Sequence, residues 1–597
     1  MNQFTERIKK LREVMAEKNI DFYLIPTADD HSSEYVSDYY KVRNYFAGFT
    51  GSAGSLLIGR EMAGLWTDGR YYIQAERQLE GSCVSLFRMG SDGVPMITDY
   101  LKAHLPEGGT LAFDGQVIDR TQGQDYEKIV EAVHGRILWD KDMAGQFWED
   151  RPERSCAPVF ELEEKYSGKS RKEKFAELRR FMDAKGGDRV LLASLEDIAW
   201  LTNLRGGDVT HTPVFLAFAL IDRERAGLYV YESAFSEEVR AHLMEDGVAL
   251  KSYMDIYRDL EGLDGGCLLY DGTKVNYALA RSVSEKVQVL PVDINKMIPK
   301  SIKNETELQN LRDIHIKDGV AMTKFMYWLK TNVGKIPMTE ISASDYLLAR
   351  RAEQEGFIEP SFGTISAYKA NAAMMHYSAT EESNAVLKPE GMLLVDSGGQ
   401  YYEGTTDITR TMVLGPITEE QKLHFTTVLR SNLNLANAQF LHGCIGINLD
   451  ILARGPIWDL HLDYKCGTGH GIGYLLNVHE APNGFRWKIV AERRDSAVFE
   501  EGMVTTDEPG IYIEGSHGIR TENELICRKG IKNGDGQFMY FEPVTYAPID
   551  LDGVDPKYMT EKERQTLNDY HAMVYGKLFD YLTDEEREWL KEYTRAI

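Results

Sequence analysis

The sequence predicts a mixed α/β protein made of three structural units, and three observations support this fold class. The chain has 597 residues, which is too many for one domain, and 43% of them are hydrophobic, so several cores can form. A helix–strand–hairpin order occurs near the N-terminus and again later in the chain. The last part, about 300 residues long, is rich in glycine and β-branched residues, so strands should alternate there with helices.

The two N-terminal units follow one order of elements. In the first, Ile8, Leu11 and Met15 fall at helical spacing, and an apolar strand stops at Pro26. The expected strands are 22–25, 55–58 and 63–67 in the first unit, and 190–193, 215–221 and 226–231 in the second, where a helix at 175–182 leads. We interpret this order as an internal repeat of two α/β domains, although the same order is common in unrelated proteins.

The domain boundaries are predicted from breaks in the pattern. A polar run with two prolines separates the two copies, and a second break lies near Pro291. After it, Asn304 and Glu307 have the spacing of a capping box, which opens a long helix. The expected domains are residues 1–158, 159–298 and 299–597, the last with a C-terminal extension from about residue 541.

Composition excludes several classes of protein. The net charge is −25, which disfavours binding to nucleic acid. The six cysteines form no CxxC pair, so a disulfide scaffold is not expected. The first residues contain no apolar core of a signal peptide, and the chain has no apolar run long enough to span a membrane. We therefore expect a cytoplasmic protein without a membrane partner.

Two aspartates in the third unit occupy unusual positions. Asp396 ends an apolar run, where a charge is unfavourable unless it is paired or bound to a metal. Asp407 opens an alternating β-branched strand, where aspartate is disfavoured. Eleven residues apart, the two could meet across adjoining strands. The alternative is that each caps a turn beside glycine.

A glycine-rich segment around His470 and two acidic segments follow. The glycine spacing differs from that of a dinucleotide loop, and His479-Glu480 lacks the second histidine of a zinc helix. The glycines should instead let backbone approach closely while the imidazole of His470 points outward. Glu508 supplies a further charge, and so do Arg520 and Glu522, which we expect on one strand with both side chains on the same face. An Arg beside a Glu is, however, most often a plain ion pair.

Together these residues predict a centre with two divalent metal ions. Four carboxylates balance the charge of two divalent ions, whereas one ion would leave the cluster repelling itself. Oxygen-rich ligation with one imidazole favours Mn²⁺, while Zn²⁺, Co²⁺ and Fe²⁺ stay open. Such a pair activates water and polarises a carbonyl, which is the chemistry of hydrolysis. The ligand set is Asp396, Asp407, His470, Glu508 and Glu522.

These motifs make the sequence similar to the three-domain Xaa-Pro aminopeptidases (aminopeptidase P), within the methionine aminopeptidase, prolidase and creatinase group. The resemblance spans essentially the whole chain and is specific in the order of its motifs. The matching segments are Trp66 to Tyr71, His376-Tyr377, Asp396 to Gly398, Gly404 to Thr411, Gly467 to Gly471, Asn477 to Glu480, Asp507 to Gly510 and Gly518 to Asn523.

The resemblance implies two creatinase-like α/β domains, a "pita-bread" catalytic domain and a homodimer. It also implies roles for side chains. Asp407 and Glu522 would bridge both ions, Asp396 would complete one site, and His470 with Glu508 the other. Glu508 would act as general base on a metal-bridged hydroxide. His376 and His479 would hold the substrate, and Arg520 would orient ligands from behind, with Arg410 acting similarly or contacting substrate.

The implied substrates are peptides with proline in the second position, which lose their N-terminal residue. Two alternatives stay open: a prolidase, which cleaves Xaa-Pro dipeptides only, and a non-catalytic peptide-binding protein on the same fold. One departure is Cys466, which stands where many relatives carry a histidine. It either packs beneath the glycine segment or ionises and contacts substrate or metal. Arg70 is a further candidate for a substrate contact, in the wall of the site.

Overall fold

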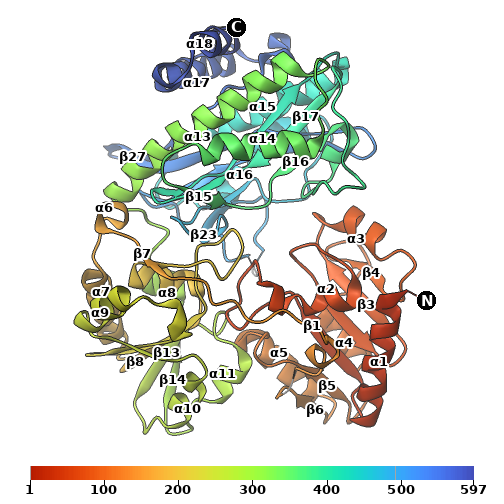
Figure 1. Ribbon diagram of the computed structural model, residues 1–597, viewed down its shortest axis with the longest axis vertical. Helices are drawn as coiled ribbons and strands as arrows, with labels where there is room; N and C mark the ends of the chain where they lie inside the picture. Colours follow the sequence, from red (N-terminus) through yellow and green to blue (C-terminus); the bar gives the residue numbers. More distant parts are fainter. Residues whose placement is uncertain (1, 141, 491–492) are drawn as a thin grey trace. The chain divides into compact units, whose positions relative to one another are not determined.

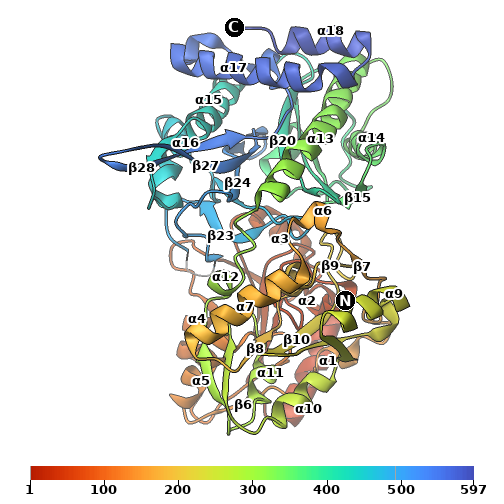
Figure 2. The same cartoon turned by 90° about the vertical axis from the view of Figure 1, so that its left-hand side faces the viewer.

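The computed structural model describes residues 2–140, 142–490 and 493–597. The chain divides into two compact units (Figures 1 and 2). Unit 1 comprises Met1–Glu163 and Lys169–Ile298, and unit 2 comprises Glu164–Gly168 and Pro299–Ile597. Unit 2 thus includes the short helix α6 (Glu164–Ser167), which comes from the middle of the N-terminal sequence. None of the helices in the described ranges has the length and hydropathy needed to cross a membrane.

The first sheet of unit 1 has six strands in the order β4-β3-β2-β1-β5-β6. The strands β1, β2 and β3 form an antiparallel meander, while β4, β5 and β6 each run parallel to their inner neighbour. Their bounds are β1 Phe22–Pro26, β2 Ser55–Gly59, β3 Ala63–Thr67, β4 Ser85–Arg88, β5 Thr110–Phe113 and β6 Arg136–Leu138.

Helices cover both faces of this sheet because its strands are apolar on both sides. Tyr23 and Ile25 pack with α1 (Gln3–Glu17), whose buried residues include Ile8 and Leu11. On the other face, Phe22 and Leu24 pack with α4 and α5. The helices around this sheet are α2 Val42–Ala47, α3 Tyr72–Gln78, α4 Ile97–His104 and α5 Arg120–Glu131.

The second sheet of unit 1 repeats the first in strand order and direction, so the predicted internal repeat is confirmed. Its order is β12-β11-β10-β8-β13-β14. The strands are β8 Arg189–Leu192, β10 Ala217–Asp222, β11 Ala226–Val230, β12 Val248–Ser252, β13 Cys267–Tyr270 and β14 Gln288–Pro291. The helices are α7 Arg171–Lys185, α8 Leu195–Thr202, α9 Glu237–Glu245, α10 Asp255–Glu261 and α11 Tyr277–Arg281.

Unit 2 combines long helices with several sheets (Figure 2). The predicted capping box is present at the start of its first long helix, α13, where Asn304 and Glu307 cap each other's backbone. Five further α-helices follow in the described part of unit 2. The helices are α13 Glu305–Asn332, α14 Glu340–Ala352, α15 Glu419–Ala436, α16 Gly446–Trp458, α17 Glu561–Leu578 and α18 Asp584–Tyr593.

Two sheets of unit 2 carry the residues of interest. One has the order β16-β17-β20, and the other β21-β28-β27-β24-β22-β23. The backbone N–H of Glu522 donates to the carbonyl of Thr409 at 3.1 Å, which joins the two sheets at β20 and β27. The strands are β16 Ile365–Tyr368, β17 Met392–Ser397, β20 Ile408–Val413, β21 Gln439–Leu441, β22 Gly469–Gly471, β23 Glu480–Phe485, β24 Val504–Asp507, β27 Asn523–Asn533 and β28 Gly536–Pro543.

Candidate metal centre

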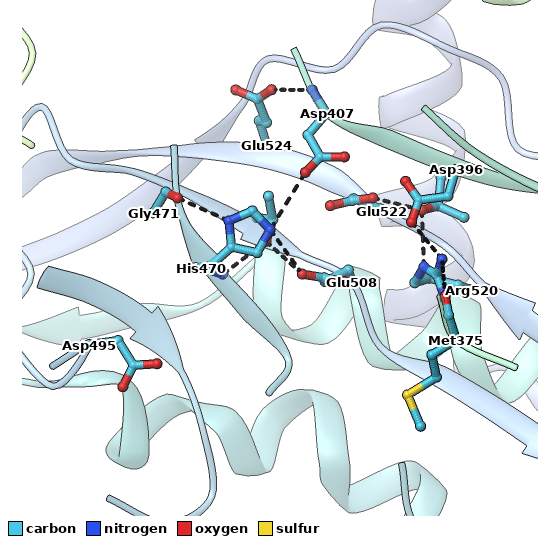
Figure 3. A network of polar contacts seen from close by, with 12 residues as sticks. Met375, Asp396, Asp407, His470, Gly471, Asp495, Glu508, Arg520, Glu522 and Glu524 are labelled. Atoms are coloured by element: carbon cyan, nitrogen blue, oxygen red, sulfur yellow. Dashed lines mark hydrogen bonds and ion pairs between the residues drawn. The ribbon is translucent and has the colours of Figure 1, made fainter. Parts of the chain in front are cut away.

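Five side chains from five places in unit 2 converge on one point (Figure 3). Each stands on, or beside, the end of a strand, so the sheets fix their directions. Asp396 lies on β17, Asp407 directly before β20, His470 on β22, Glu508 directly after β24 and Glu522 directly before β27. These are the five residues that the sequence predicts as ligands.

His470 lies at the centre of the cluster. Potential ligand atoms of Asp407, His470 and Glu522 all lie within 4.8 Å of one another. The Nε2 atom of His470 is 3.5 Å from Oδ2 of Asp407 and 3.4 Å from Oε1 of Glu508. Its Nδ1 lies 2.9 Å from the carbonyl of Gly471 and therefore carries the proton. This leaves the lone pair of Nε2 facing the carboxylates, as metal ligation requires.

Burial and mutual repulsion act together on the carboxylates. Asp407 and Glu522 are 4% and 1% exposed. Burial, and then the charges of neighbouring carboxylates, raise the pKa of both groups well above its ordinary value. Among the described residues, Oδ1 of Asp396 and Oδ1 of Asp407 are buried without a hydrogen-bonding partner. Divalent ions would supply the missing partners and neutralise the repulsion, so the residues present fit a metal centre.

Hydrogen bonds from neighbouring side chains orient the carboxylates of the cluster. The guanidinium of Arg520 donates to Oδ2 of Asp396, to the hydroxyl of Thr409 and to the hydroxyl of Tyr512, at 2.5, 3.1 and 2.6 Å. The hydroxyl of Thr409 in turn donates to Oε2 of Glu522 at 2.7 Å. One arginine and one threonine thereby link carboxylates on two sheets.

The glycines around His470 serve close backbone packing, as predicted, and the approaching group is the protein's own chain. A Cβ on Gly469 would lie 1.8 Å from the carbonyl oxygen of Thr506, and one on Gly471 2.3 Å from that of Glu480. Glycine therefore lets β22 fit between β23 and β24. The imidazole of His470, between these two glycines, points to the carboxylates (Figure 3).

The two other predicted histidines are half-buried. The ring of His479 lies 4.3 Å from that of His470, nearly perpendicular to it at 80°. His376 follows Met375, whose carbonyl oxygen is 3.5 Å from Nη2 of Arg520. Both histidines are therefore close in sequence or space to groups of the cluster.

Cys466 is half-buried, and its neighbours disfavour the thiolate. Burial, followed by the negative charge of Glu508, raises the pKa of Cys466 to about 11. The side chain is therefore a neutral thiol at physiological pH. Of the two interpretations of this residue, the uncharged one fits these surroundings.

Arg410 lies behind the cluster. Its side chain is buried, and all of its N–H groups are hydrogen-bonded. Its guanidinium donates to the carbonyls of Thr409, Glu522, Ala547 and Pro548, to the side chain of Asn523 and to the hydroxyl of Tyr570. No N–H is left for a substrate, so a role in holding Glu522 fits better than a substrate contact. Arg70 lies in unit 1, where it forms a two-pronged ion pair with Asp68 at 2.8 and 2.7 Å.

Two features differ from the sequence analysis or were not seen in it. Arg520 and Glu522 were expected on one strand, but β26 (His517–Arg520) ends at Arg520, and the chain crosses there from one sheet to the other. Glu524 was missed as a supporting group: its Oε1 accepts the backbone N–H of Asp407 at 2.8 Å (Figure 3). The signal in the sequence that could have revealed Glu524 is that it is a second acidic residue, two positions after Glu522.

Comparison with known proteins identifies the family. Over 609 residues the chain is 36% identical to "Probable Xaa-Pro aminopeptidase P" of Botryotinia fuckeliana, covering 98% of this chain and 92% of that protein. The chain belongs to the Xaa-Pro aminopeptidase P group of metallopeptidase family M24. The model of metallopeptidase family M24 matches residues 309–529, and the C-terminal region of this peptidase matches 537–597. Two creatinase/prolidase N-terminal domain models match 7–140 and 150–307.

Solved structures agree with this membership. The X-prolyl aminopeptidase of Caenorhabditis elegans, described as a cytosolic enzyme with a di-nuclear active site, superposes with a TM-score of 0.94 at 30% identity and covers 100% of both chains. An Xaa-Pro dipeptidase from Bacillus anthracis covers 64% of this chain and 99% of its own, with a TM-score of 0.50 and 24% identity, and shares the fold. The predicted fold class, two creatinase-like domains and a pita-bread domain, is confirmed.

Proposed function

We propose that the protein is a metal-dependent aminopeptidase that removes the N-terminal residue from peptides with proline in the second position. One observation carries this function. A cluster of four carboxylates and one imidazole, in which Asp396, Asp407 and Glu522 are buried, is intact in a chain that matches Xaa-Pro aminopeptidases over its whole length. A non-catalytic binding protein on this fold would not need the complete set.

The proposed ligands of two divalent ions are Asp396, Asp407, His470, Glu508 and Glu522. The four carboxylates match the four positive charges of the ions, and Mn²⁺ suits their oxygen-rich set. When bound, the ions would lower the pKa of water and polarise the carbonyl of the scissile bond. By analogy with the family, Asp407 and Glu522, which are the most buried carboxylates of the set, would be ligands of the ions.

Side chains of this protein accept and donate the protons of the reaction. Glu508 accepts the proton of the attacking water, and its position is fixed by the hydroxyl of Thr506, which donates to Oε1 at 3.1 Å. His376 and His479 donate to the oxygen and nitrogen of the substrate as the bond breaks. Arg520 keeps Asp396 in place. A peptide bond to proline has no N–H, so the site must recognise its substrate without that donor.

The rival activity is that of a prolidase. The Xaa-Pro dipeptidase that shares the fold covers 64% of this chain, so part of this protein has no counterpart in that dipeptidase. We propose domains 1–158, 159–298 and 299–597, in which the two N-terminal domains restrict access to short peptides. Arg70 is the proposed wall residue among them.

The deciding experiment compares three peptides with the purified protein and Mn²⁺: Arg-Pro-Pro, Arg-Pro and Arg-Ala-Pro. Release of arginine from Arg-Pro-Pro, with little from the other two, is the expected result. Preferential cleavage of Arg-Pro would support the prolidase. Absence of cleavage of all three, while Mn²⁺ binds, would overturn the aminopeptidase assignment. Glu508→Gln is the matched control for contaminating peptidases.

We also propose a cytoplasmic homodimer. On α16, Ile447, Ile451 and Trp458 are 38, 49 and 38% exposed. Trp487 lies beside Trp458, with ring centroids 6.0 Å apart. Exposed apolar groups of this kind commonly mark interfaces. Light scattering at micromolar concentration should give the mass of a dimer for the wild type and of a monomer for Trp458→Glu.

A further inference from the structure

Helix α16 carries a buried arginine, Arg454, whose guanidinium makes several hydrogen bonds. The side chain of Arg454 is 0% exposed. Its Nε and Nη2 donate to the two carboxylate oxygens of Asp450 at 2.7 and 3.2 Å, and its Nη1 donates to Oδ1 of Asp463 at 2.8 Å. A buried guanidinium is unfavourable unless it is paired in this way.

The remaining contacts of Arg454 reach the segment that leads into His470. Nη1 donates to the carbonyl of Tyr464 at 2.9 Å, and Nη2 donates to the carbonyl of Cys466 at 3.0 Å and to the hydroxyl of Thr468 at 3.3 Å. The guanidinium also stacks on the ring of Tyr464, 3.8 Å from its centroid. Arg454 therefore contacts three residues of the segment that precedes His470.

Asp450 extends the same network to Thr468. The hydroxyl of Thr468 donates to Oδ1 of Asp450 at 2.6 Å and therefore accepts from the hydroxyl of Tyr464 at 2.5 Å. All these groups are buried, and the hydroxyl of Thr468 both donates and accepts. A network whose members are satisfied in this manner specifies one conformation.

Thr468 connects the network to the cluster in two directions. Its carbonyl accepts the backbone N–H of Glu508 at 2.8 Å. Two residues later along the chain, the imidazole of His470 faces Oε1 of Glu508 at 3.4 Å. A displacement of Thr468 would therefore move both residues.

We propose that Arg454 and Asp450 are positioning residues that fix His470 and Glu508 in the geometry needed to bind metal. The proposal rests on the proposed function, because it assigns these two ligands to the metal centre. Neither residue touches substrate. Lysine cannot replace Arg454, since an ammonium cannot reach the separate acceptors that the planar guanidinium serves.

The test measures Mn²⁺ binding to the metal-free protein by calorimetry, together with thermal unfolding and kcat/KM on Arg-Pro-Pro. The variants are Arg454→Lys and Thr468→Val, with Thr468→Ser as the conservative rescue. Loss of partners behind ligands typically weakens metal affinity by about 10–100-fold. We expect at least about tenfold weaker Mn²⁺ binding in Arg454→Lys and Thr468→Val, with Thr468→Ser near the wild type.

Arg312→Lys is the matched control, because Arg312 forms a two-pronged ion pair with Glu542 elsewhere in unit 2, at 2.7 and 2.8 Å. It should bind Mn²⁺ as the wild type does. Folded Arg454→Lys and Thr468→Val proteins with unchanged affinity would overturn the proposal. If Arg454→Lys does not fold, Thr468→Val and Thr468→Ser decide alone.

The failure of the proposed function would look different from the failure of this proposal. If the wild type binds Mn²⁺ but does not cleave Arg-Pro-Pro, the aminopeptidase assignment is wrong. The comparison of Mn²⁺ affinities among the variants then still tests the positioning role. A wild type that binds no Mn²⁺ sinks both.

Discussion

Nη2 of Arg520 donates to Oδ2 of Asp396 at 2.5 Å, while Oδ1 of the same carboxylate has no hydrogen-bonding partner among the described residues. The ion pair thus fixes one oxygen and leaves the other directed at the cluster. Because the same guanidinium also donates to Thr409 and Tyr512, it sets the angle of Asp396 as well as its distance.

The variant Arg520→Lys should therefore keep a positive charge beside Asp396 but no longer fix the orientation of its carboxylate. We expect metal affinity or kcat/KM to fall by about 10–100-fold, as for other partners that orient ligands. Metal content after dialysis against micromolar Mn²⁺, measured beside kcat/KM, checks this. Wild-type values for both would mean that the charge alone suffices.

Asp407→Asn and Glu522→Gln should each lose bound metal and activity together. Each change removes one negative charge from a set of four that matches two divalent ions, and leaves a buried amide in its place. Metal analysis and turnover measure the two effects. Glu403→Gln, which alters a carboxylate paired with Lys317 at 2.7 Å, is the control and should behave as the wild type. Normal metal content with normal turnover in either variant would rule out the dinuclear assignment.

Glu508→Gln should lower kcat more than it raises KM. The amide keeps the shape of the side chain but cannot take a proton, and loss of a general base usually costs about 10²–10⁴-fold in rate. Steady-state kinetics on Arg-Pro-Pro separates the two constants. An effect confined to KM would place the base elsewhere.

Cys466→Ala should keep kcat/KM within about tenfold of the wild type, a change of about 1.4 kcal/mol in the activation free energy. The pKa of about 11 keeps the thiol neutral, so its removal takes away neither a charge nor a strong donor. The preferred metal should also be unchanged. A loss of more than about a hundredfold, or a different metal preference, would make this cysteine part of the active site.

Stabilisation of the protein by Mn²⁺ should increase with pH. In the metal-free protein, the pKa values of Asp407 and Glu522 are raised above those of the unfolded chain. Each group therefore disfavours folding once the unfolded chain has deprotonated, above about pH 4, and more so as pH rises toward the folded pKa. Metal replaces the bound protons, so the Tm shift on adding Mn²⁺ should be larger at pH 8 than at pH 5.5. An equal shift at both values would contradict the raised pKa values.

The sequence singled out Asp396 and Asp407 because each is a charge in a place that disfavours charge, and it singled out His470 because of the glycines around it. Asp396 ends a buried strand, and His470 stands between glycines that have no room for a Cβ. The same reasoning missed Arg454 and Thr409, because an arginine on an amphipathic helix and a threonine on a strand are ordinary there. Only the fold reveals that their partners come from distant parts of the chain.

The N-terminal repeat was predicted from the central strands and not from the outer ones. The strands β8 and β10 are apolar over most of their length, whereas β4 and β14 are half-exposed four-residue edges. A short edge strand has too little periodicity to be distinguished from a loop. The break between Arg520 and Glu522 was missed for a related reason. Where the chain passes from one sheet to another, the alternation of polar and apolar residues along the sequence does not change.

The position of Arg410 makes the end of the chain a part of the catalytic unit. Its acceptors include the carbonyls of Ala547 and Pro548 and the hydroxyl of Tyr570, all beyond the last proposed ligand in sequence. A shortened protein ending after β27 would retain every proposed ligand and yet leave the cation of Arg410, next to Glu522, without three of its six hydrogen-bond acceptors. Efforts to obtain a minimal catalytic fragment therefore have to retain these residues.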